Sequence, residues 1–190
     1  YESVQNMFLK LYDDGYLYRD KKIVNWDPEA KTTLSNEEVI YKEKTAKLFY
    51  LKYKLESSEE FILVATTRPE TIFGDTAVAV NPNDKRYKKL VGKKLIVPLV
   101  NRVVPILGDI SVDSEFGTGC LKVTPAHSEK DFEIGLRNNL DIIDIFNDDA
   151  SLNGYGLHYK SLDRFAVRKK IINELDEKGL LDKAEDYTHN

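Results

Sequence analysis

The sequence is poor in the residues that build disulfide and zinc scaffolds. Among 190 residues there is one cysteine, Cys120, and there are three scattered histidines. A single cysteine excludes an internal disulfide and fits a reducing compartment, so we expect a cytoplasmic protein. The same scarcity argues against a structural zinc, and no metal site is predicted.

Long apolar runs and an excess of positive charge are also missing. The apolar runs fall far short of a membrane span, and the first residues do not read as a signal peptide, so no membrane partner is expected. The absence of an initiator Met predicts a segment of a longer protein. Lys and Arg number 28 against 32 Asp and Glu, a net charge of −4. Because a chain that holds nucleic acid mainly through its phosphates is usually basic, any nucleic-acid contact should be local or shared with another domain.

Many short strands and a few helices dominate the predicted secondary structure. Helices are expected at residues 2–14, 84–90, 128–139 and 162–178 from apolar spacing and end signals. Residues 48–55 and 61–66 alternate or run apolar around a turn, which predicts an antiparallel hairpin. Further short strands are expected at residues 16–18, 22–26, 39–41, 76–80, 95–98, 103–107, 110–112, 121–124 and 142–146. This pattern predicts a β-rich α+β domain built around a barrel.

Two segments about fifty residues apart carry most of the chemically useful side chains. They are residues 65–76 and 116–127, and each combines hydroxyls, one cation and turn-forming Gly or Pro at the end of a strand-like run. Such segments can surround a small polar ligand with hydrogen-bonding groups. If both line one cavity, the chain is a binding or hydrolytic domain that recognises hydroxyl and amine groups.

Four motifs resemble those of a known family. They are Thr66-Thr67-Arg68-Pro69-Glu70-Thr71, Gly74-Asp75-Thr76-Ala77-Val78-Ala79-Val80, Asp113-Ser114-Glu115-Phe116-Gly117-Thr118-Gly119 and Val24-Asn25-Trp26-Asp27-Pro28. Over nearly its whole length, the chain is similar to the editing domain inserted into class I aminoacyl-tRNA synthetases for branched aliphatic amino acids. The first motif is shared by the valine, isoleucine and leucine enzymes, whereas the others lean towards the valine enzyme.

The resemblance implies a fold and a division of the chain. The fold is the distorted β-barrel of valyl-, isoleucyl- and leucyl-tRNA synthetase editing domains, with peripheral helices. Residues 1–44 would be an N-terminal flank and connector, residues 45–160 the editing barrel core, and residues 161–190 a C-terminal helix and flank.

The resemblance also implies an activity and its partners. The activity is hydrolysis of the ester that joins threonine to the terminal adenosine of valine tRNA, so the partner is the 3′ CCA end of a mischarged tRNA. Neither His-X-Gly-His nor Lys-Met-Ser-Lys-Ser occurs. This segment is therefore not expected to use ATP or to charge tRNA, and editing needs no cofactor. The remainder of the synthetase would be a second partner in the full-length protein, and the isolated domain is expected to be a monomer.

Three alternatives stay open from the sequence. The first is the isoleucine or leucine version of the editing domain, which would remove a different wrong amino acid. The second is a module that docks the CCA end without cleaving the ester, and the third is a barrel without retained activity. Assays with several mischarged tRNAs separate the first alternative from the valine version.

The resemblance assigns roles to eleven residues. Asp131 matches the carboxylate that pairs with the α-amino group of the substrate, although a helix beginning at Ser128 also makes it a capping position. The other expected catalytic residues are Thr66, Thr67, Lys122 and His127. The expected substrate-binding residues are Arg68, Thr71, Phe116, Gly117, Thr124 and Ser128.

Several of these residues are assigned a specific contact, and some also have a simpler structural interpretation. Thr71 is expected to read the hydroxyl of the substrate, and Phe116 to stack on the terminal adenine. Lys122 lies in a strand, where a lysine normally faces solvent, and His127 is expected to position other groups rather than to act as a base. Many valine enzymes have Asp where this chain has Ser128, which can hydrogen-bond but brings no charge.

Overall fold

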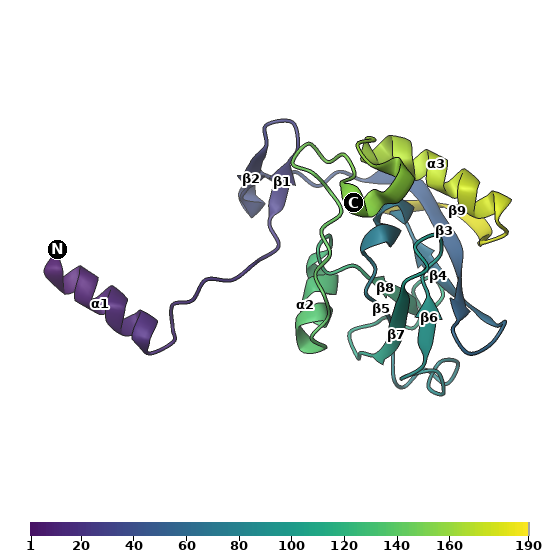
Figure 1. Cartoon of the computed structure of the whole chain (residues 1–190), viewed down its shortest axis with the longest axis horizontal. Coiled ribbons are helices and arrows are strands. Elements are labelled where there is room, and N and C mark those ends of the chain that lie inside the picture. The colour runs from purple at the N-terminus through teal and green to yellow at the C-terminus, as the bar shows by residue number, and fades with distance from the viewer. Residues whose placement is uncertain (190) are drawn as a thin grey trace.

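Strand β3 (Lys44–Leu55) is the central element of the computed structural model, which describes residues 1–189 (Figure 1). β4 (Phe61–Thr66) pairs antiparallel with one edge of β3, as the predicted hairpin requires. Two strands share the opposite edge: β9 (Leu181–His189) pairs with the first part of β3, and β6 (Lys94–Ile96) pairs with its end.

The sheet continues from β6 into a nearly closed barrel. β6 pairs with β7 (Val103–Gly108), which runs parallel to β5 (Ala77–Val80), and β5 pairs antiparallel with β8 (Cys120–Val123). β8 then lies against β4, so that the two ends of the strand path meet. The predicted β-rich fold, a distorted barrel with peripheral helices, is confirmed.

The alternation along β3 separates two apolar clusters. Leu51, Tyr53 and Leu55 are buried in the main core inside the barrel. A smaller cluster covers the other face of the strand, and its members are Leu48, Tyr50, Ala65 and Tyr187. β9 pairs with the edge of β3 and contributes Tyr187 to this second cluster, so β3 carries apolar side chains on both faces.

Helices α2 (Glu129–Arg137) and α3 (Arg164–Glu177) lie on the outside of the barrel (Figure 1). α2 begins after Ser128, whose hydroxyl accepts a hydrogen bond from the backbone N–H of Asp131 at 3.3 Å, as the N-cap prediction requires. α3 is capped by Asp163 and ends before Gly179, whose φ of +67° suits a residue without a side chain. The 3₁₀ turns are η1 (Asn36–Glu38), η2 (Pro69–Gly74) and η3 (Gly154–Tyr159).

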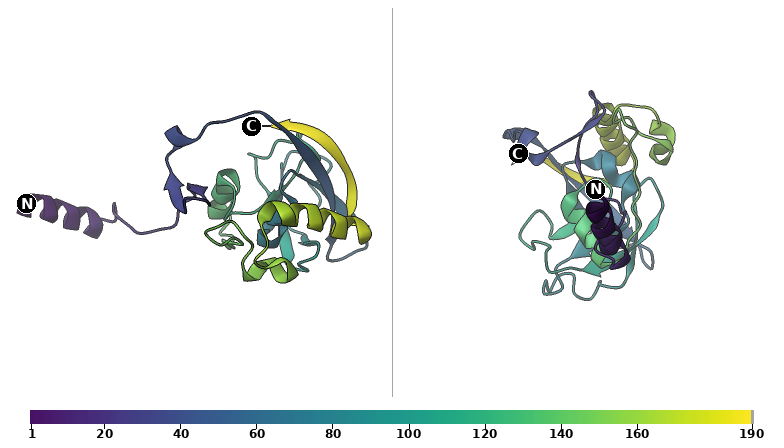
Figure 2. Two further views of the ribbon diagram at one scale, coloured as in Figure 1. Left: turned by 90° about the horizontal axis from the view of Figure 1, so that it is seen from above. Right: turned by 90° about the vertical axis from the view of Figure 1, so that its left-hand side faces the viewer.

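The N-terminal segment extends away from the barrel. α1 (Glu2–Asp13) has the predicted apolar spacing but buries no residue, and it projects from the rest of the molecule in Figure 1 and in the left-hand view of Figure 2. The small sheet of β1 (Asn25–Asp27) and β2 (Thr32–Leu34) follows. Its Trp26 Nε1–H donates to the backbone oxygen of Asp148 at 2.8 Å, which ties this sheet to the barrel. Within residues 1–189, no helix has the length and apolar character to cross a membrane.

Some elements differ from the sequence-based predictions. Residues 16–18, 39–41 and 110–112 do not form strands, and residues 84–90 form turns rather than a helix. Residues 142–146 keep only an isolated bridge from Phe146 to Leu152. β-Favouring side chains make a strand only where a partner strand is available, and none of these segments pairs over more than a single bridge within residues 1–189. β9 is the opposite case, because its charged sequence predicted no strand and its pairing with β3 forms one.

Candidate active site

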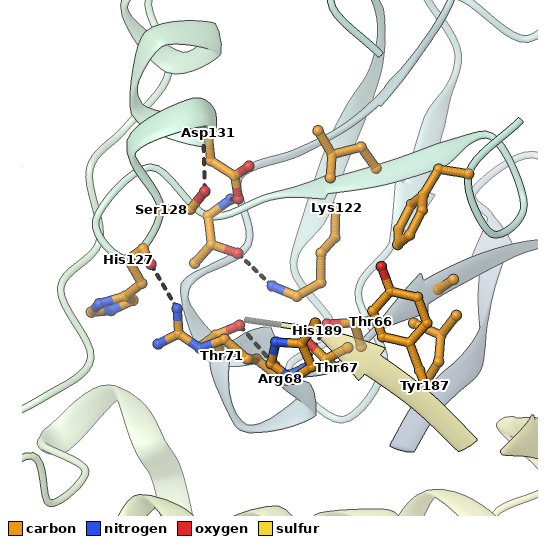
Figure 3. A pocket seen from close by; sticks show the side chains of 15 residues that line it. Thr66, Thr67, Arg68, Thr71, Lys122, His127, Ser128, Asp131, Tyr187 and His189 are labelled. Carbon is orange, nitrogen blue, oxygen red and sulfur yellow. Dashed lines mark hydrogen bonds between the residues drawn. The ribbon is translucent and has the colours of Figure 1, made fainter. Parts of the chain in front are cut away.

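A cavity of about 330 Å³ opens where β4, η2, β8, β9 and the start of α2 meet (Figure 3). The structure brings ten of the eleven predicted site residues around it. They are Thr66, Thr67, Arg68, Thr71, Phe116, Lys122, Thr124, His127, Ser128 and Asp131. The eleventh, Gly117, lies just behind the wall, where a Cβ would come within 2.8 Å of the Cβ of Ala65. The two predicted segments therefore share one cavity.

The turn after β4 forms the hydroxyl-rich side of the cavity. The strand ends at Thr66, so Thr66 and Thr67 both line the cavity although neighbours in a regular strand point to opposite faces. The Thr66 hydroxyl accepts from the backbone N–H of Arg68 at 3.1 Å. The Thr71 hydroxyl donates to the backbone oxygen of Arg68 at 2.9 Å, which leaves its lone pairs for a ligand. The Thr67 hydroxyl makes no hydrogen bond within residues 1–189.

Lys122 is buried and held by a carboxylate that the predicted site did not include. Its side chain is 7% exposed, and its Nζ lies 2.8 Å from Asp75 Oδ1 and donates to Thr124 Oγ1 at 2.5 Å. Thr124 Oγ1 donates to the same Asp75 oxygen at 2.7 Å, and the hydroxyl of Tyr53 donates to the other oxygen at 2.6 Å. Asp75 is fully buried, so this network fixes the ammonium of Lys122 in place. Two of its three N–H groups are used, and one remains for a ligand.

Asp131 is a buried carboxylate with one committed oxygen. The residue is 6% exposed, and its Oδ2 accepts from the backbone N–H of Thr124 at 2.9 Å. The other oxygen has no hydrogen-bond partner within the described chain. Burial raises the pKa of Asp131, while the positive charge of Lys122 and the bond from Thr124 act in the opposite direction. An isolated carboxylate in such a place is stabilised by a cationic ligand that restores its charged form.

His127 contributes its backbone to the cavity and its ring to the fold. Its carbonyl oxygen accepts from Arg68 at 2.8 Å, and Figure 3 shows its ring turned away from Lys122. The ring Nε2 accepts from the backbone N–H of Ile145 at 3.1 Å, so the ring proton is on Nδ1. Burial, with the charges of Arg68 and Lys122, lowers the pKa of His127 to about 3. The ring has no spare lone pair for a substrate proton, which supports the positioning role.

Aromatic side chains form one wall of the cavity. Phe116 meets Tyr187 edge to face, with ring centroids 5.7 Å apart, and Tyr187 stacks on His189 at 5.9 Å. Tyr187 and His189 come from β9, and neither was among the predicted site residues because β9 was not predicted. Among residues 1–189, no group of three His, Cys, Asp or Glu side chains is placed to hold a metal ion.

Comparison with known proteins identifies the family of the chain. Residues 1–183 match the family of class I tRNA synthetases for isoleucine, leucine, methionine and valine. The chain belongs to this class I synthetase family. It is 59% identical over 185 residues to a valine–tRNA ligase of Christiangramia forsetii, covering 97% of this chain and 21% of the ligase. It is 55% identical over 188 residues to the valine–tRNA ligase of Thermotoga maritima, covering 99% and 22%. The predicted resemblance to the valine branch is confirmed.

A solved class I synthetase shares the fold. The ternary complex of the Agrobacterium radiobacter K84 agnB2 LeuRS with tRNA and LeuAMS superposes with a TM-score of 0.60 at 21% identity, covering 97% of this chain and 31% of that one. At this identity the likeness concerns the fold. This class I synthetase chain spans about a fifth of the length of the valine–tRNA ligases that it matches.

Proposed function

We propose that the chain is a post-transfer editing domain that hydrolyses the ester of threonine attached to the terminal adenosine of valine tRNA. The observation that carries the proposal is Asp131, a buried carboxylate whose second oxygen has no partner in the described chain and which lies beside a hydroxyl-lined cavity. An aminoacyl ester brings an ammonium group that matches this oxygen. The relationship to valine–tRNA ligases supports valine tRNA as the carrier and threonine, which has nearly the shape of valine, as the amino acid that is removed.

The cavity offers a way to distinguish threonine from valine. The two amino acids have nearly the same shape, and a hydrophobic pocket rejects threonine only about a hundredfold, a value already known for valyl-tRNA synthetase and taken here as given. Thr71 can accept a hydrogen bond from the threonine hydroxyl, because its own proton is committed to Arg68. Valine would leave this acceptor unpaired, at about 1–3 kcal/mol, or about 5- to 150-fold in rate.

Hydrolysis needs only small contributions from the chain, because the ester is already activated. Asp131 holds the ammonium, and the remaining N–H of Lys122 stabilises the oxyanion that forms on the carbonyl oxygen. The hydroxyls of Thr66 and Thr67 and the vicinal ribose hydroxyl position the attacking water. Water adds to the carbonyl carbon, the carbon–oxygen bond to the ribose breaks, and the ribose oxygen takes up a proton. Free threonine and uncharged tRNA leave.

The test is deacylation of threonyl-tRNA(Val) beside valyl-tRNA(Val) and mischarged isoleucine and leucine tRNAs. We expect the threonyl ester of valine tRNA to be cleaved fastest. Thr71→Val should reduce the preference for threonine over valine, whereas the matched control Thr45→Val, on an exposed part of β3, should not. Faster cleavage on isoleucine or leucine tRNA would assign the chain to those enzymes. Binding of the CCA end by folded protein without any cleavage would replace the proposal by a docking role.

A further inference from the structure

A second cavity, of about 390 Å³, lies on the other side of Arg68. The barrel supplies Arg68 and His127 to its lining, α3 supplies Arg164, and the segment before β1 supplies Lys22. The hydrogen bond from Trp26 to the backbone of Asp148 closes it between the β1–β2 sheet and the barrel. Arg68 is thus common to both cavities, and a ligand that occupies the first one approaches the second at this guanidinium.

Positive charge is in surplus around Arg68. The carboxylate of Glu70 is fully buried and is neutralised by Arg168, whose Nε and NH2 groups donate to its two oxygens at 2.8 and 2.5 Å. Arg68 Nε lies further from it, at 3.8 Å from Oε1. Arg164 is the first residue of α3, where the helix dipole adds to its charge. The positive charges of Arg164 and Arg168 therefore act on Arg68, while the carboxylate of Glu70 is already paired with Arg168.

The cavity also contains two carboxylates, which do not cancel this surplus. Asp144 has a side chain that is 70% exposed, and its Oδ1 already accepts from the backbone N–H of Phe146 at 3.1 Å. The second is Asp148. Lys22, Arg68 and Arg164 outnumber them in the lining. In a chain with a net charge of −4, this concentration of cations marks a local site for an anion.

We propose that the second cavity binds the phosphodiester on the 5′ side of the terminal adenosine, with Arg164 and Lys22 completing a site that begins at Arg68. The inference rests on the proposed function, which places the ester of that adenosine in the first cavity. The ester-bearing ribose and its 5′ phosphate belong to one nucleotide, and Arg68 stands between the two cavities. Guanidinium groups suit this ligand because they donate two parallel hydrogen bonds to phosphate oxygens.

The experiment compares binding of adenosine 5′-monophosphate and adenosine to this chain by calorimetry at low salt. We expect the monophosphate to bind at least tenfold more tightly. Arg164→Gln and Lys22→Gln should each reduce this preference about fivefold or more and leave the affinity for adenosine unchanged. The control Lys169→Gln removes a charge from an exposed position of α3 that lines neither cavity, and it should keep the full preference.

Three results would overturn the inference. One is equal affinity for the two ligands, another is a preference that survives both Gln substitutions, and the third is displacement of the monophosphate by an equal concentration of inorganic phosphate. If Arg164→Gln fails to fold, Lys22→Gln still tests the inference, because Lys22 lies outside the barrel. Because the assay measures binding, a chain that shows the phosphate preference but cleaves no threonyl ester would contradict the proposed function and not this site.

Discussion

Replacing Asp131 by Asn and by Ala separates the charge of the candidate site from its contribution to the fold. Asp131→Ala removes the acceptor of the Thr124 N–H at 2.9 Å, and a buried unpaired N–H costs about 1–3 kcal/mol of the free energy of unfolding. Asp131→Asn keeps an oxygen in the same place and removes only the charge. We therefore expect Ala to destabilise the chain by that amount and Asn to destabilise it far less.

Hydrolysis should respond differently from stability. A hydrogen bond to a charged group contributes about 1.5–3 kcal/mol, so both substitutions should lower kcat/KM for threonyl-tRNA(Val) by about 10- to 150-fold. The measurements are deacylation rates and urea unfolding of the same preparations. A folded Asp131→Asn variant with unchanged kcat/KM would remove Asp131 from the site, and the ammonium-binding argument with it.

The pH dependence of deacylation and of stability is also expected to depend on Asp131. Burial raises the pKa of Asp131 above its ordinary value of 3.8, and only the carboxylate form holds an ammonium. Activity should therefore fall as the pH drops through this raised pKa, and Asp131→Asn should lack that acid limb. The folded chain binds the Asp131 proton more tightly than the unfolded chain, so this group lowers stability as the pH rises through its pKa. Asp131→Asn should remove this contribution, so the stability of the Asn variant relative to the original chain should improve as the pH rises.

Three further substitutions or titrations test the surrounding structure. Asp75→Asn leaves the buried ammonium of Lys122 without its counter-charge and should lower the free energy of unfolding in urea by about 3–5 kcal/mol. Adding Lys122→Met should recover part of this loss. A single Asp75→Asn variant as stable as the original chain would contradict the network. Gly117→Ala forces a side chain into a backbone with φ of +57° and against Ala65, so the unfolding free energy should fall by at least about 1–2 kcal/mol and deacylation should slow. The ring of His127, with its pKa lowered to about 3, should show no NMR titration between about pH 5 and pH 8, and a midpoint near 6.5 would be incompatible with its buried acceptor role. Stability should also fall as the pH drops from 6.5 towards 3, because only the unfolded chain takes up that proton.

The parts of the fold with strong local signals could be predicted from the sequence. Alternation marked β3, and Ser128 followed three residues later by Asp131 marked the start of α2. The two hydroxyl-rich segments were expected to meet, and the cavity joins them. Signals of this kind depend on neighbours in the sequence, which is why they are readable without coordinates.

The parts that depend on distant partners could not be predicted. Four of the nine residues of β9 are charged, and only its pairing with β3 makes it a strand that brings Tyr187 to the cavity. Lys122 has the sequence context of a solvent-facing lysine, and its burial depends on Asp75, which is 47 residues away in the chain. The one available hint was an acidic residue directly before an apolar strand. Predicting the pair requires the register of β5 and β8, which the sequence does not state.

The position of β9 affects how the protein is made. A ribosome synthesises β3 long before β9, the strand that pairs with its second edge. Until β9 is made, the backbone groups along this edge stay unpaired, and Leu48 and Tyr50 lack their packing against Tyr187. During this interval the unpaired edge of β3 can form β-pairs with other extended segments. The aromatic wall of the cavity is also still missing, because Tyr187 and His189 belong to β9. Formation of the cavity is therefore a late event in biosynthesis, and a ribosome that stalls before β9 is expected to release an aggregation-prone intermediate.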